Sequence, residues 1–283
     1  VLDVILIMGL LTAFLMGLVA LVQNDIKRII AYSTISQLGY MTVALGASYY
    51  SFAIFHLLTH AFFKALLFLC AGSIILKCHH EQNINKMGGL KTIMPITFIS
   101  FMIAGLSLIG FPGFSGFFSK DLIIDIFKYN NNYLVYYILE ISIVITTLYT
   151  AKIFFKVFFG DNQLKVKNDN IREHNNTLLL PLIILAIPSA IVGWLLFDSV
   201  IFNNFFLGSI TDVNNINYFY QSYIIHSTTF IIHSLTSMSF LALISGGVSC
   251  SSSGIGGNLR AIPVSTSIVV VTKKKIFRIS SYS

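Results

Sequence analysis

Charge is scarce in this chain of 283 residues. Only 10% of the residues are charged, 55% are hydrophobic, and the mean hydropathy is +0.81. A water-soluble fold of this length does not need so much apolar surface, so the composition predicts a polytopic membrane protein. The formal net charge of +7 then reflects basic loops on one side of the membrane, and we predict no nucleic-acid partner.

Cysteine is also scarce, and the usual cofactor motifs are missing. Cys70, Cys78 and Cys250 form no CxxC pair and no iron–sulfur spacing. The segment CHHE at 78–81 contains possible metal ligands, but a loop cluster of this kind is more often incidental. The sequence has no phosphate-binding loop, dinucleotide fingerprint or nucleophile motif. We therefore predict no metal and no cofactor in this chain, with any redox chemistry located elsewhere.

Apolar segments of spanning length recur along the chain and predict an all-α bundle of about seven transmembrane helices. The fourth segment is too long for one crossing and is interrupted by FPGFSG at 111–116. Proline and glycine weaken a helix, so we expect non-helical backbone from about Ile109 to Phe118, with Gly113 and Gly116 least able to carry a side chain. Broken helices of this kind often form ion sites in transporters. The seven segments are roughly 4–22, 28–46, 50–76, 95–127, 133–158, 178–197 and 222–247.

The basic residues predict a topology for these seven segments. If the helices alternate in direction, the loops 23–27, 77–94 and 159–177 and the C-terminal tail share one side of the membrane. Most of the 18 lysines and arginines lie there or at the adjoining helix ends. The positive-inside rule assigns that side to the matrix or cytoplasm and the start of the chain to the opposite side.

The third segment carries the most informative pattern. His56, His60 and Lys64 recur every four residues in SFAIFHLLTHAFFKALLF, so a helix places them on one face, about 6 Å apart along its axis. A lysine near the bilayer centre costs about 2.5–3.5 kcal/mol on insertion scales, so it must face protein or water. The pattern indicates a proton relay. The alternative is a snorkelling lysine, with two histidines hydrogen-bonded between helices.

Further ionisable residues lie at and after the predicted break. Lys120 and Asp121 follow it directly, and a lysine beside a carboxylate can load and release a proton when its surroundings change. The alternative is a salt bridge that fixes the broken helix. Glu140, in the fifth segment, is a weaker candidate for a further relay or pairing group. The second segment is unusually polar around Gln37, which predicts a helix buried against others or lining a wet cavity.

Four stretches together resemble the antiporter-like subunits of respiratory complex I, and among these the subunit 5 family of mitochondrial NADH dehydrogenase. A looser match follows at 181–194. The Mrp-type sodium/proton antiporter subunits share the core motifs and remain an alternative. The four stretches are QNDIKRIIAYSTISQLGYM (23–41), HLLTHAFFKALLFLCAGSII (56–75), EQNINKMGGLKTIMP (81–95) and GFPGFSGFFSKDLII (110–124).

The resemblance implies a fold of two inverted five-helix repeats, of which this chain holds the second. It implies that Lys64 is the central lysine of a proton path, that His60 and His56 form its relay, and that Lys120 and Asp121 form the exit-side pair. Proton movement would be coupled to electron transfer by FMN, iron–sulfur clusters and ubiquinone in other subunits. The expected location is the mitochondrial inner membrane, with the basic loops and C-terminal tail in the matrix.

The family's chains are longer, and the first repeat has no counterpart in this sequence. We therefore expect a partial or split subunit, with the first repeat on a separate chain, a subunit 4 homologue as neighbour, and the lipid bilayer around it. The expected division is a membrane region at 1–200, followed at 201–283 by an interfacial loop, a last span and a basic tail. A third possibility is a membrane scaffold that has lost conduction.

Overall fold

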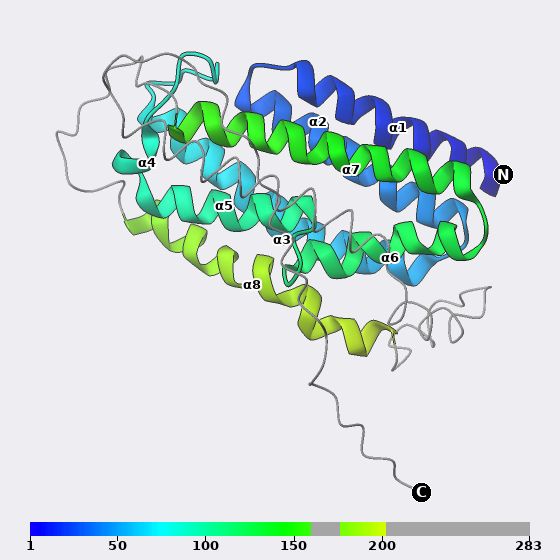
Figure 1. The fold of residues 1–283 in the computed structure, drawn as a ribbon. Coiled ribbons are helices and arrows are strands. Elements are labelled where there is room, and N and C mark those ends of the chain that lie inside the picture. The colour runs from blue at the N-terminus through cyan, green and yellow to red at the C-terminus, as the bar shows by residue number, and fades with distance from the viewer. Residues whose placement is uncertain (160–175, 202–283) are drawn as a thin grey trace, which may run out of the picture. The chain divides into compact units, whose positions relative to one another are not determined.

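The computed structural model describes residues 1–159 and 176–201, and the described helices follow the predicted segments closely (Figure 1). The predicted span 222–247, most of the loop 159–177 and the tail lie outside the described residues, as does the region 201–283 apart from Ile201. The helices are α1 (Leu2–Val22), α2 (Ile26–Gly46), α3 (Tyr50–Lys77), α4 (Leu90–Ile93), α5 (Pro95–Ile109), α6 (Ser115–Tyr129), α7 (Tyr133–Phe154), a π-helical turn (Phe155–Phe159) and α8 (Asn176–Ile201).

Four stretches of the described helices are long and apolar enough to cross a membrane. They are Leu2–Val22, Tyr50–Lys77, Tyr133–Phe159 and Leu178–Phe197. Many large apolar side chains on these helices are exposed in the isolated chain, which suits a lipid environment. The chain is a polytopic helical membrane protein, as its composition predicts.

Helix α2 is as long as α1 but much more polar, and three polar side chains in its middle are buried. Ser33, Ser36 and Gln37 are at most 1% exposed. The Ser36 hydroxyl donates a hydrogen bond of 2.6 Å to the Ala13 carbonyl of α1, so α1 and α2 pack closely. The prediction that this helix is buried against others is confirmed.

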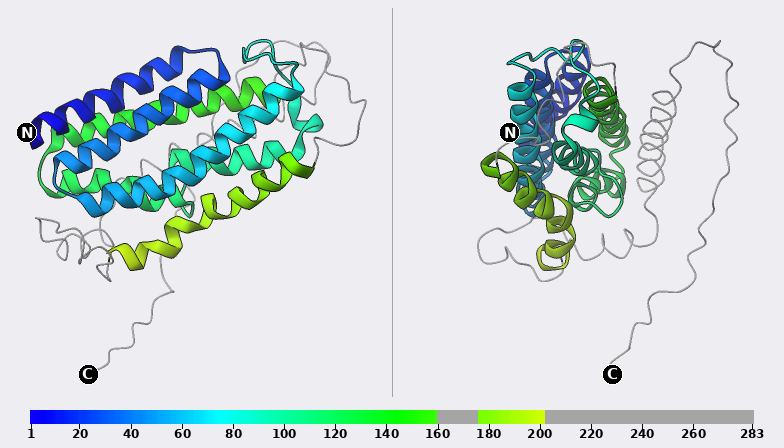
Figure 2. Two further views of the ribbon diagram at one scale, coloured as in Figure 1. Left: turned by 180° about the vertical axis from the view of Figure 1, so that it is seen from behind. Right: turned by 90° about the vertical axis from the view of Figure 1, so that its left-hand side faces the viewer.

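Helix α3 lies at the centre of the described helices and contacts α2, α5, α6 and α8. Helix α1 packs against α2 and α7, and α8 covers α3, α5 and α6. Figures 1 and 2 show α1 and α8 along opposite edges of this group. The histidine–lysine face of α3 is therefore enclosed by protein.

The predicted break in the fourth segment is confirmed, but it is shorter than expected. Helix α5 ends at Ile109, Gly110 takes a left-handed conformation (φ 87°), and α6 begins at Ser115 and not near Phe118. Gly113 has φ 93°, a region that side chains disfavour. The prediction that Gly113 must be glycine is confirmed by this backbone angle.

Gly116 is confined by space and not by its backbone angle. A Cβ atom at this position would overlap the carbonyl group of Ser107 in α5. The hydroxyls of Ser107 and Ser115 both donate to the Ser189 carbonyl of α8, the former at 2.8 Å. These bonds explain why the helix resumes early, because Ser115 is already fixed against α8.

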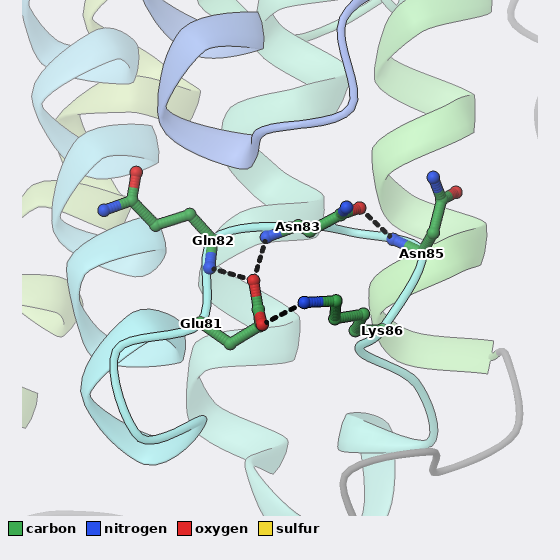
Figure 3. Close-up of polar contacts among 5 residues, drawn as sticks. All are labelled: Glu81, Gln82, Asn83, Asn85 and Lys86. Atoms are coloured by element: carbon green, nitrogen blue, oxygen red, sulfur yellow. Dashed lines mark hydrogen bonds and ion pairs between the residues drawn. The ribbon is translucent and has the colours of Figure 1, made fainter.

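The turns that connect α1 to α2 and α3 to α4 form a second ordered region, which we call the end turns (residues 23–25 and 78–89). Asp25 and Asn83 form an antiparallel bridge between them. In Figure 3 the Glu81 carboxylate accepts from the backbone N–H groups of Gln82 and Asn83 at 3.1 and 3.0 Å, and from Lys86 Nζ at 2.9 Å. The Lys86 hydrogen bond, followed by the one from Asn83, lowers the pKa of Glu81.

The end of α7 lies against the same turns. Lys152 Nζ donates to the carbonyls of Leu21 and Gln23 at 2.8 and 2.6 Å, and Lys156 donates to the Asn85 side chain. The loops 23–27 and 77–94 therefore share one end of the described helices, as the predicted topology requires. The prediction that they face the matrix stays a prediction.

The segment 78–81 forms no metal-binding geometry within the described part of the chain. No group of three or more His, Cys, Asp or Glu side chains converges there. His79 and His80 both have left-handed backbone (φ 54° and 67°), while Cys78 turns inward and is fully buried. Burial, and secondarily the Glu81 charge, raises the pKa of the Cys78 thiol to about 11.

Candidate functional site

The histidine–lysine line on α3 is buried inside the helical group. His56, His60 and Lys64 are 0%, 7% and 4% exposed. The rings of His56 and His60 lie 6.0 Å apart, and Phe63 packs edge-on against His60 at 5.4 Å. Lys64 does not extend to a surface, so the structure contradicts the snorkelling lysine of the alternative; its other part, histidines hydrogen-bonded between helices, stays open.

Lys64 has a neutral hydrogen-bond partner on the neighbouring helix. Its ammonium donates to the Ser33 hydroxyl of α2 at 2.5 Å, and Ser33 in turn donates to the Ile30 carbonyl at 2.8 Å. A hydroxyl can both donate and accept, whereas a carboxylate would hold the lysine as a fixed ion pair. The Ser33 hydroxyl therefore does not hold Lys64 as a fixed ion pair.

His56 connects α3 to two other helices. Its Nε2 lies 3.3 Å from Oε1 of Gln37 on α2, and its Nδ1 lies 2.9 Å from the Ser119 hydroxyl on α6. The Ser119 hydroxyl is also 2.8 Å from the hydroxyl of Thr59. Both ring nitrogens are thus engaged, one toward α2 and the other toward the helix that begins after the break.

Lys120 is fully buried and next to Ser119 in the sequence. Its ammonium donates to the Thr146 hydroxyl of α7 at 3.2 Å and lies 4.9 Å from the centre of the Tyr40 ring. Asp121 and Glu140 are also buried and interact electrostatically with Lys120. The second buried lysine, like Lys64, is thus held by a neutral hydroxyl, with an aromatic face beside it.

These side chains form one region, which we call the buried relay. His56 lies between the two lysines and is within electrostatic range of both. Lys120 also lies within electrostatic range of Lys64. Its residues come from α2, α3, α6 and α7: Ser33, Gln37, His56, Thr59, His60, Lys64, Ser119, Lys120, Asp121, Glu140 and Thr146.

Sequence reasoning found the ionisable members of this region but missed several neutral ones. Ser119, Thr59 and Thr146 were not identified, although Ser119 directly precedes Lys120 and Thr59 lies on the same turn as the histidines. The polarity of α2 did predict that the segment around Gln37 is buried against other helices. A hydroxyl residue within one turn of a buried lysine or histidine is the signal that could have found Ser119 and Thr59.

Comparison with known proteins identifies the family. A family model described as NADH:quinone oxidoreductase/Mrp antiporter, transmembrane, matches residues 1–146. This chain belongs to that family. The match covers just over half of the chain and includes the six ionisable residues that the sequence singled out as site candidates.

Curated relatives extend the similarity beyond residue 146. NADH-quinone oxidoreductase subunit L of Neisseria meningitidis is 47% identical over 225 residues, which covers 72% of this chain and 33% of the relative. NADH-ubiquinone oxidoreductase chain 5 of Yarrowia lipolytica is 45% identical over 225 residues, 77% of this chain and 34% of the relative. Subunit L of Escherichia coli is 47% identical over 197 residues, which covers 69% of this chain and 32% of the relative. The chain spans about a third of the length of these relatives.

Proposed function

We propose that this chain is a proton-translocating membrane subunit of an NADH:quinone oxidoreductase and that protons cross it through the buried relay. The proposal rests mainly on one observation: two buried lysines, each hydrogen-bonded to a hydroxyl, both lie within electrostatic range of the buried His56. The family match and the names of the curated relatives support the complex to which we assign it.

The relay provides a series of proton carriers that runs along α3 and then passes to α6. Lys64 and His60 are one turn apart on α3, as are His60 and His56. His56 then reaches Ser119 on α6, beside Lys120. Lys120 holds the next proton near Asp121 and Glu140, whose charges act on it. Protons pass along this line when the charge on one lysine changes the cost of charge on the other.

The proposal extends to the setting of the chain. Its partners are the other membrane subunits of the complex, with a subunit 4 homologue among them and a further polypeptide supplying the first repeat. FMN, iron–sulfur clusters and ubiquinone belong to other subunits, which carry out the redox steps. The location is the mitochondrial inner membrane, with the end turns toward the matrix.

Two substitutions of Lys64 test the proposal. Lys64→Met keeps the length and apolar bulk of the side chain but removes the amine, while Lys64→Arg keeps a permanent charge that cannot cycle. Losing one proton-transfer group slows transfer by about 10²–10⁴-fold, so both variants should lower the number of protons pumped per electron. The measurement is NADH oxidation and proton uptake together, in vesicles carrying the assembled complex.

Lys77→Met is the matched control, because Lys77 lies in the last turn of the same helix and outside the buried relay. It should leave the proton-to-electron ratio unchanged. A normal ratio in both Lys64 variants, at normal assembly, would mean that Lys64 is only a buried structural charge and would overturn the proposal.

A sodium/proton antiporter subunit is the second candidate, because the matching family model covers both kinds of protein. Purification distinguishes them. Recovery of this chain with redox subunits and NADH-dependent proton uptake supports the first function. Recovery without redox subunits, with sodium-dependent proton exchange, supports the second.

A further inference from the structure

One buried tyrosine beside the relay, Tyr149, has no part in the proton path proposed for it. Tyr149 of α7 is 1% exposed, and its hydroxyl faces the side chains of Gln37 and Ser33 on α2. In this conformation the hydroxyl completes no hydrogen bond of ordinary geometry with the described residues, and neither does Nε2 of Gln37. Buried polar groups are normally paired, so these two atoms need partners.

The two atoms can satisfy each other, because the remaining bonds around them are already assigned. Gln37 Oε1 faces His56, so the amide nitrogen of Gln37 points to its other side. Ser33 accepts from Lys64 and donates to Ile30, which leaves one lone pair on its oxygen. A phenol hydroxyl has one donor and two acceptor positions. Tyr149 can therefore accept from the Gln37 amide nitrogen and donate to Ser33.

This arrangement determines where His56 carries its proton. With Gln37 Oε1 held toward the ring, Nε2 of His56 must be the donor and Nδ1 the acceptor. Nδ1 then accepts from the Ser119 hydroxyl. The Thr59 hydroxyl, which donates to the His56 carbonyl at 3.1 Å, must then share its proton with Ser119, 2.8 Å away. If the Gln37 amide turned over, its nitrogen would face Nε2, and the neutral ring would have to carry its proton on Nδ1. The hydrogen bond with Ser119 would then reverse direction.

We propose that Tyr149 is a positioning residue that fixes the Gln37 amide, and through it holds His56 in the tautomer with the proton on Nε2. In the same place it joins the Lys64–Ser33 pair to the Gln37–His56 pair. The proposal rests on the proposed function, since the tautomer matters only if His56 passes protons. No covalent bond changes. The tyrosine acts through the orientation of one side-chain amide.

Tyr149→Phe tests this, because it removes the hydroxyl and keeps the ring that packs in the core. It should lower the proton-to-electron ratio of the assembled complex by less than Lys64→Met does, since every proton carrier is still present. The control is Tyr49→Phe, which removes the hydroxyl of another largely buried tyrosine. That hydroxyl accepts a hydrogen bond of 3.1 Å from the Asn130 side chain, and neither residue belongs to the relay. That variant should pump normally.

A double-mutant cycle with Gln37→Met separates positioning from general packing. Methionine has no amide to orient, so adding Tyr149→Phe to Gln37→Met should cause no further loss per assembled complex. This comparison remains decisive even if Tyr149→Phe reduces the amount of complex. A normal ratio in Tyr149→Phe, or additive losses in the double variant, would overturn the inference.

The Lys64 variants show which proposal has failed. If Lys64→Met lowers the ratio while Tyr149→Phe does not, the relay stands and the role of Tyr149 is wrong. If neither changes the ratio, the relay itself is wrong, and the inference fails with it.

Discussion

The buried relay and the end turns use the same residue types in opposite ways. In the end turns, Lys86 pairs with Glu81 at 2.9 Å and Arg28 with Asp25 at 3.2 Å, all partly exposed to solvent. In the relay, Lys64 and Lys120 donate to the hydroxyls of a serine and a threonine. In the end turns a carboxylate thus fixes Lys86, while Lys152 and Lys156 from the end of α7 donate to neutral groups there. In the relay both lysines donate to hydroxyls, which suits the changes of charge that we propose for them.

The difference shows how environment assigns a role to the same side chain. A surface ion pair in water contributes at most about 1 kcal/mol and tolerates exchange of partners. A buried lysine beside a hydroxyl is far more sensitive, because no water can replace a lost partner. Substitutions in the relay should therefore change function, whereas equivalent changes in the end turns should change only local order.

The largest expected effect lies at the helix break that positions Lys120. In Gly116→Ala the new methyl group would overlap the Ser107 carbonyl, so α5 and α6 must separate. Overpacking of this kind costs about 1–3 kcal/mol or more, and we expect less assembled complex and less proton pumping. The amount of complex in native gels and the proton uptake of vesicles measure both effects.

Gly105→Ala is the matched control on the other side of the break. A methyl group there meets no atom within 4 Å, so the variant should assemble like the wild type. Equal assembly of both alanine variants would contradict the close contact between α5 and α6. The helices around Lys120 would then tolerate an added methyl group.

The next effect concerns the link between α3 and α6. Ser119→Ala removes the hydroxyl that links His56 of α3 to the first turns of α6, directly before Lys120. A single hydrogen bond contributes a net of about 0.5–1.5 kcal/mol, so assembly should persist while the proton-to-electron ratio falls. Ser73→Ala is the control, because Ser73 also contacts a threonine on a neighbouring helix, Thr97 at 3.3 Å. If the proton-to-electron ratio fell in both variants, the effect would be due to packing and not to the link between His56 and α6.

The ionisable half of the relay was predictable from the sequence, for a definite physical reason. A four-residue spacing fixes which side chains share a helix face, so the spacing alone groups His56, His60 and Lys64. The break was also predictable, because Pro112 removes a backbone donor and Gly113 and Gly116 weaken a helix. Its end was misplaced by about three residues, since the bonds from Ser107 and Ser115 to α8 join positions far apart in the sequence.

The neutral half was not predictable, because it depends on how the helices are rotated against each other. Ser33 meets Lys64 and Thr146 meets Lys120 only after α2 and α7 have packed. No local pattern records that rotation. Lys120 illustrates the difficulty: its charge interacts with that of Asp121 beside it in the sequence, as expected, but its hydrogen-bond partner Thr146 lies on another helix.

The smallest expected effect is in the end turns. Glu81→Gln removes the charge that holds Lys86 and weakens the acceptor for the N–H groups of Gln82 and Asn83. The proton-to-electron ratio should not change. Amide exchange at Gln82 and Asn83 should become faster than in the wild type at neutral pH, while Asn85, whose N–H is bound by the Asn83 side chain, should change less.

Acid should reproduce the effect of that substitution in the wild type. The Lys86 hydrogen bond lowers the pKa of Glu81, so the carboxylate stabilises the folded turn at every pH above its unfolded value of about 4.3. The stabilisation is lost as the pH falls below that value and through the lowered pKa of the folded state. Exchange at Gln82 and Asn83 should therefore stay slow down to about pH 4 after correction for intrinsic rates, and approach that of Glu81→Gln below it. If the protection of these amides in Glu81→Gln equals that of the wild type across this range, the carboxylate does not hold the turn. Lys86 would then not be fixed by its carboxylate, and the contrast with the relay lysines would fail.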